Sequence, residues 1–110
     1  MANFASISDI IAGMPQHFLP AAAAGLNTTL QLDLSGEGGG QWHLVIADQQ
    51  LKINDGLAAN PNMTLKMAAA DYLAMINGEA DAMQMFMAGK IKVGGDMSLA
   101  LKMQSLFKLR

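Results

Sequence analysis

The sequence contains no cysteine and unusually few charged residues. The lack of cysteine excludes a disulfide framework, a thiolate metal site and a cysteine nucleophile, and it fits a reducing compartment. Charged residues make up 15% of the chain, whereas about 25% is usual for soluble domains. The formal net charge is −2, and nucleic-acid-binding domains are normally basic. We therefore expect no nucleic-acid partner.

The sequence also lacks long apolar runs and targeting signals. Its apolar stretches are only a few residues long, far below the roughly 18 residues that a membrane span needs. No cationic run precedes an apolar one near the N-terminus, and residues 107–110 do not form a peroxisomal address. We therefore expect a cytoplasmic protein. Its 110 residues, 52% of them hydrophobic, are typical of one folded domain over residues 1–110.

Helical spacing of apolar residues occurs near both ends of the chain. It first appears over residues 7–18, where Ser6 can cap the helix and Pro15 should bend or restart it. A short turn over residues 20–24 follows. Further helices are predicted over residues 69–76, 81–88 and 97–108. Asp96 is the expected N-cap of the last one.

Strict alternation of apolar and polar residues predicts five strands. They cover residues 29–34, 41–46, 50–54, 63–67 and 90–93. The first four follow one another and have one apolar and one mostly polar face, as in an antiparallel sheet covered on one side. The glycine-rich residues 36–40 join two strands and lack the Lys-Ser/Thr of a phosphate loop, so they indicate a hairpin loop. The fold class is therefore α+β.

Catalytic and metal-binding patterns do not emerge from the polar residues. His17 and His43 are 26 positions apart, without the spacing of a metal site. The carboxylates fall at turns, helix starts and polar strand faces, where capping or solvation explains them, and no nucleophile elbow is present. We expect no catalytic residue, no metal and no cofactor.

Two features indicate contact with something outside the core. Ten methionines outnumber the six aromatic residues, and methionine suits adaptable binding surfaces as well as ordinary cores. In the last helix, Met97 and Leu101 lie outside the apolar arc that would rest on a sheet, so they could contact a ligand, a partner chain or a membrane. Deep packing of this helix is the alternative.

The charges are unevenly distributed. Residues 90–110 carry five basic residues against Asp96. Such a cationic end can attract anionic lipid headgroups. Alternatively, Lys108 and Arg110 complement the helix dipole, and the strand lysines keep the sheet soluble.

The order of elements and several short motifs resemble the sterol carrier protein type-2 (SCP-2) domain family. The resemblance covers nearly the whole chain and is most specific between Phe86 and Asp96. The motifs are Gly78-Glu79-Ala80-Asp81, Phe86-Met87, Gly89-Lys90-Ile91-Lys92-Val93, Gly95-Asp96 and residues 99–107, with Ala23-Ala24-Gly25-Leu26-Asn27 and the glycine-rich hairpin before Trp42 upstream.

The resemblance implies a five-stranded, mostly antiparallel sheet with helices packed on one face, enclosing an apolar tunnel. It implies non-enzymatic binding, shielding or transfer of a fatty acid, acyl-CoA, sterol or isoprenoid lipid, with possible transient membrane contact. A charged headgroup would stay at the tunnel mouth beside Lys90, Lys102 or Lys108. By analogy the tunnel is lined by Trp42, Leu44, Met67, Met83, Phe86, Met87, Leu99, Met103, Leu106 and Phe107.

Two other functions stay open at this point. The chain could be a structural or regulatory interaction module that docks through its apolar helix flank onto itself or a partner. It could also be an accessory subunit that presents a lipid to a separate enzyme. The sequence fixes neither the cargo nor the oligomeric state.

Overall fold

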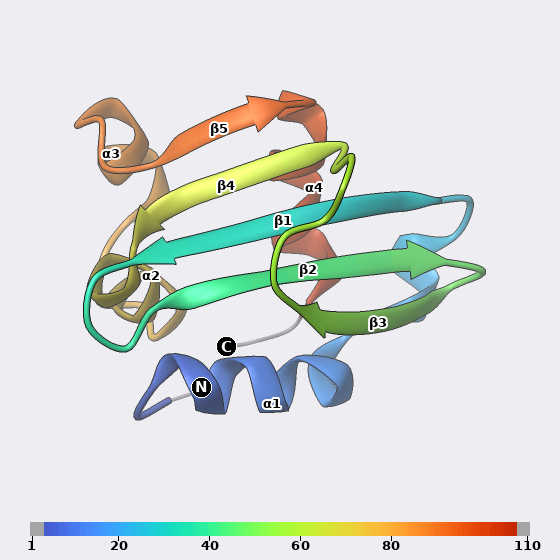
Figure 1. Cartoon of the computed structure of the whole chain (residues 1–110), viewed down its shortest axis with the longest axis horizontal. Coiled ribbons are helices and arrows are strands. Elements are labelled where there is room, and N and C mark those ends of the chain that lie inside the picture. The colour runs from blue at the N-terminus through green and yellow to red at the C-terminus, as the bar shows by residue number, and fades with distance from the viewer. Residues whose placement is uncertain (1–3, 108–110) are drawn as a thin grey trace.

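The computed structural model describes residues 4–107, apart from the side chains of residues 100, 101 and 104. A five-stranded sheet is combined with helices in the predicted order, which confirms the α+β class (Figure 1). The helices are α1 (Ile7–His17), the short 3-10 helix η1 (Pro20–Ala23), α2 (Ala69–Ile76), α3 (Ala82–Met87) and α4 (Met97–Leu106). The strands are β1 (Thr28–Ser35), β2 (Gly40–Ala47), β3 (Gln50–Asp55), β4 (Met63–Ala68) and β5 (Lys92–Gly95).

The strands lie in the order β3-β2-β1-β4-β5, and three of the four neighbouring pairs are antiparallel. The exception is the central pair, in which β1 and β4 run parallel with Leu32 opposite Leu65. Our expectation of an antiparallel arrangement for the first four strands is wrong for this pair. The reason is that β3 ends at one edge of the sheet, and the chain crosses back over β2 and β1 before β4 begins (Figure 1).

The two faces of the sheet are covered differently. In Figure 1, α4 passes behind the sheet, whereas the loop of residues 56–62 crosses in front of it. We call these sides the helix face and the front face. The alternating apolar residues, such as Leu30, Leu32 and Leu34 of β1, are almost fully buried, as the sequence pattern predicts.

Gln31 holds the crossing loop against the front face. Its Nε2 donates to the carbonyl oxygens of Trp42 (3.0 Å) and Gly56 (3.3 Å), and its Oε1 accepts from the N–H of Ala58 (2.7 Å). His43 Nδ1 lies 3.1 Å from the same Gly56 oxygen. Gln31 is only 2% exposed, so these bonds satisfy a buried amide as well as fixing the loop.

Most helix boundaries agree with the predicted caps. The Ser6 hydroxyl accepts from the N–H of Asp9 (3.2 Å), and the Asp96 carboxylate accepts from the N–H of Ser98 (2.9 Å). The Ser98 hydroxyl and N–H also lower the pKa of Asp96, because both stabilise the charged carboxylate. Pro15 lies in the last turn of α1, which ends at His17.

The fifth strand begins two residues later than predicted. Gly89 has a positive φ of 78°, and the N–H of Lys90 donates to the carbonyl of Met85 (2.9 Å). This pattern is a Schellman motif that closes α3. Lys90 is therefore used to end the helix and cannot also start the strand.

Asn62 joins three parts of the fold. Its N–H donates to the Thr29 carbonyl (2.8 Å), and its side-chain Oδ1 accepts from the Thr29 N–H (2.9 Å). Its own carbonyl accepts from the N–H of Asp96 (3.0 Å), the N-cap of α4. Gly95 passes so close that an added Cβ would lie 2.4 Å from the Asn62 oxygen, and its φ is +82°. The position of α4 therefore depends on a glycine at residue 95.

We predict that Gly95→Ala lowers the free energy of unfolding by about 2 kcal/mol or more, because it adds both a steric clash and left-handed backbone strain. Gly94→Ala is the matched control, since its Cβ would meet no atom closer than 4.0 Å. Thermal unfolding of both variants tests the difference. Equal melting temperatures would show that the backbone around Asn62 relaxes freely, contrary to this prediction.

Candidate functional site

The interior lies between the helix face of the sheet and the helices. Apolar side chains from every described strand and α-helix contribute to one core cluster. Methionine is prominent in it, because Met14, Met63, Met67 and Met85 are buried while Met75 and Met103 pack against the cluster partly exposed. Unbranched methionine side chains adapt readily to new neighbours. This layer is the candidate site for an apolar ligand.

Seven of the ten predicted lining residues lie in or against this layer. The buried ones are Leu44, Met67, Leu106 and Phe107. The half-buried ones, packed against the same cluster, are Trp42, Leu99 and Met103. The structure thus brings together side chains from β2, β4, α4 and its C-cap Phe107 that are up to 65 positions apart in the chain.

The other three predicted lining residues lie on α3 and face outward. Met83 is 59% exposed, Phe86 43% and Met87 79%. Met85, which the sequence reasoning did not include in the lining, is the buried residue of this helix. The three lining residues of this helix were expected by analogy with the family, and a helix of six residues is too short for its apolar periodicity to single out the buried face.

The C-terminal end of α4 is hydrogen-bonded to the segment that follows α1. The N–H of Leu19 donates to the Leu106 carbonyl (2.8 Å), and the rings of Phe18 and Phe107 lie 5.7 Å apart. A backbone bridge joins Phe18 and Phe107 as well. These contacts hold the end of α4 against the segment that follows α1.

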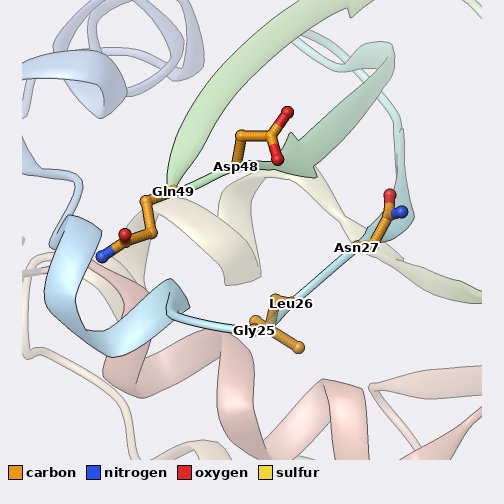
Figure 2. Close-up of a pocket in the computed structure, with 5 residues that line it drawn as sticks. All are labelled: Gly25, Leu26, Asn27, Asp48 and Gln49. Carbon is orange, nitrogen blue, oxygen red and sulfur yellow. The ribbon is translucent and has the colours of Figure 1, made fainter.

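A separate hollow of about 310 Å³ opens between η1 and the β2–β3 hairpin. It is lined by Gly25, Leu26, Asn27, Asp48 and Gln49, and the Gln49 side chain reaches over to donate to the Pro20 carbonyl at 3.1 Å (Figure 2). This hollow has one apolar and three polar side chains in its lining, so it is not the apolar tunnel that we expected. The tunnel stays a prediction.

The predicted headgroup lysines divide into two groups. Lys90 and Lys102 are exposed, whereas Lys108 lies outside the described residues. Within residues 4–107 there is no group of three or more His, Asp or Glu side chains that could hold a metal ion. In the same part of the chain, no helix is long and apolar enough to cross a membrane.

Two polar side chains are buried in the apolar interior. Tyr72 on α2 is 2% exposed, and burial raises the pKa of its phenol far above the usual value. Thr28, the first residue of β1, lies on the helix face because it alternates with Leu30 and Leu32. Its hydroxyl is buried and has no hydrogen-bond partner among the described residues. Sequence reasoning missed the burial of Thr28, because this residue does not stand out from an ordinary strand pattern.

The SCP-2 sterol transfer family matches residues 10–108. The hydroxysteroid dehydrogenase-like protein 2 of Rattus norvegicus is 34% identical over 77 residues, which are 69% of this chain and 15% of that protein. The chain therefore spans less than a fifth of the length of this curated relative.

Two solved structures share the fold. The palmitated SCP2L2 from Aedes aegypti is 26% identical, with a TM-score of 0.68, and the match covers 91% of this chain and 92% of that one. A double mutant of the sec-alkylsulfatase PisA1 from Pseudomonas sp. has a TM-score of 0.83 at 14% identity, and the match covers 94% of this chain and 16% of the sulfatase. The same fold therefore occurs alone and within larger chains.

We predict that Tyr72 ionises only when the protein unfolds. The raised pKa favours the neutral phenol in the folded state, so this contribution to stability is full below about pH 10 and is lost as the pH rises above it. Tyr72 is the single tyrosine, so tyrosinate absorbance reports it directly. Absorbance and circular dichroism should change together in an alkaline titration. Ionisation near pH 10 in a protein that is still folded would contradict the burial of Tyr72.

We predict that Thr28→Val raises the free energy of unfolding by about 1 kcal/mol, because it removes an unpaired buried hydroxyl while keeping the side-chain shape. The control is Thr29→Val, at the neighbouring half-buried position on the front face. Chemical denaturation measures both changes. A loss of stability in Thr28→Val alone would mean that the hydroxyl has a partner in solution.

Proposed function

The chain belongs to the SCP-2 sterol transfer family, which implies lipid binding or transfer, and on that premise we propose that it carries one acyl or isoprenoid chain in its interior. The observation that carries the proposal is the methionine-rich apolar layer between the helix face and α4. The lipid tail would enter this layer by displacing half-buried side chains such as Leu99 and Met103.

The driving force of this binding is the burial of apolar surface. Each square ångström of lipid tail removed from water contributes about 25 cal/mol, so a long tail outweighs the cost of repacking flexible side chains. A linear tail is favoured by the palmitated state of the relative from Aedes aegypti. The headgroup would stay in solvent beside Lys90 or Lys102, which are both exposed.

We propose that this action is non-covalent. Among residues 4–107, two groups have a clearly shifted pKa, and both shifts have structural causes. Asp96 is an N-cap stabilised by Ser98, and Tyr72 is a neutral core residue. Neither is placed to move a proton at a bound lipid, because one caps a helix in solvent and the other is shielded by its burial.

A second candidate function is the presentation of a lipid to an enzyme. It is favoured by relatives in which the matched segment is a small part of a longer protein, namely a dehydrogenase-like protein and an alkylsulfatase. The interior would serve the same purpose in this case, and the lipid would be handed to a catalyst instead of being released.

Native mass spectrometry of the purified protein, followed by organic extraction, tests the carrier function. We expect an additional mass of lipid size, which also identifies the cargo class. A protein without bound lipid that also ignores a panel of fluorescent fatty acids and prenyl lipids would exclude the carrier function. Sedimentation at several concentrations would then test the alternative of an interaction module.

We predict that Met103→Glu weakens fatty-acid binding by at least about tenfold, equivalent to about 1.4 kcal/mol, because a carboxylate in the apolar layer must lose its hydration. Ser105→Glu places the same charge on an exposed position of α4 and should bind normally. Displacement of a fluorescent fatty acid measures the affinity, and circular dichroism verifies folding. Normal affinity in folded Met103→Glu would show that α4 does not line the lipid site.

A further inference from the structure

Helix α3 presents an apolar face to solvent. Met83, Phe86 and Met87 are spaced three and four positions apart, so they lie on one side of the helix, opposite the buried Met85. All three are more than 40% exposed, and Met87 at the C-terminal end is the most exposed at 79%. Clustered exposed apolar side chains of this kind mark interaction surfaces.

Lysines gather beside the C-terminal end of α3. Lys66 of β4 and Lys92 of β5 are directly opposite each other in the register, both exposed and both on the front face. Like charges in this arrangement repel each other. Lys90, also exposed, follows α3 directly. Figure 1 shows α3 at the end of the sheet where β4 finishes and β5 begins.

The nearby carboxylates do not neutralise this cluster evenly. Asp33 of β1 is opposite Lys66, on the side away from Lys92. Glu79 and Asp81 precede the N-terminal end of α3, and Asp81 accepts a hydrogen bond from the N–H of Met83 as the helix cap. Positive charge is therefore concentrated at the end of α3 where Phe86 and Met87 are exposed.

We propose that α3 and its neighbouring lysines Lys66, Lys90 and Lys92 form a docking surface for an anionic lipid bilayer. This proposal rests on the proposed lipid-carrier function and deepens it, by naming the surface through which lipid is exchanged. Apolar side chains on a short helix fit the boundary between headgroups and acyl chains, and lysines next to them fit anionic headgroups. An anionic surface also relieves the repulsion between Lys66 and Lys92.

The charge contribution is tested by flotation with vesicles of equimolar phosphatidylcholine and phosphatidylserine. We expect Lys66→Glu and Lys92→Glu each to weaken vesicle binding by at least about fivefold, the effect of one basic residue near such a surface. Lys52→Glu is the matched control, because Lys52 is an exposed lysine on the front face of β3, at the opposite edge of the sheet. It should bind like the wild type. Equal losses in all three variants would overturn the proposed location.

The apolar contribution is tested by Met87→Ser, with Leu57→Ser as the control at a similarly exposed position in the crossing loop. We expect only Met87→Ser to lose vesicle binding. A wild-type protein that ignores these vesicles, or that dimerises through α3 in sedimentation and is made monomeric by Met87→Ser, would overturn the proposal in favour of another partner.

Failure of this proposal can be told apart from failure of the carrier function. Fatty-acid displacement without vesicles measures the carrier function alone, and Lys66 and Lys92 lie outside the proposed lipid site. Normal fatty-acid affinity together with absent vesicle binding refutes only the docking surface. Absent fatty-acid affinity in the wild type refutes the carrier function.

Discussion

The parallel pairing of β1 with β4 is the constraint on which the rest of this structure depends. Two parallel neighbours cannot be joined by a tight turn, so the chain first builds β2 and β3 and then crosses the front face in residues 56–62. That crossing buries Gln31, whose hydrogen bonds to Gly56 and Ala58 hold the loop while a third bonds Trp42 of β2. It also delivers Asn62 to the point where β1, β4 and the start of α4 meet. The location of α4 across the helix face follows from this junction.

The two faces of the sheet are consequently stabilised by different forces. On the front face, directional hydrogen bonds from Gln31 and Asn62 fix the backbone within narrow limits. On the helix face, the contacts are apolar and many come from methionine, whose flexible side chain can repack when its neighbours shift. Under the proposed carrier function, a change of interior volume on lipid uptake would therefore fall on the helix side. The sheet would keep its hydrogen-bonded geometry while the apolar layer repacks.

The sequence predicted what depends on local pattern. Alternation located the strands, and the side chains of Ser6 and Asp96 marked the helix starts that the structure confirms. It did not predict the parallel central pair, because alternation describes the faces of a strand and carries no information about its neighbour. Nor did it predict the burial of Gln31, which looks like any polar residue on a solvated face until residues 56–58 cover it.

In the candidate site, too, local sequence pattern predicted only part of which side chains are buried. The predicted lining residues of β2, β4 and α4 lie in or against the core cluster, since long periodic elements define a buried face. Their role in lining a lipid site stays a prediction. The outward position of Met83, Phe86 and Met87 could not be read from six helical residues, because their burial is decided by how α3 is anchored at its ends. Those anchors are the Asp81 cap and the Schellman motif at Gly89, which together turn Met85 inward. Two local capping interactions thus fix the ends of α3, and between them Met85 packs into the core while Met83, Phe86 and Met87 are exposed.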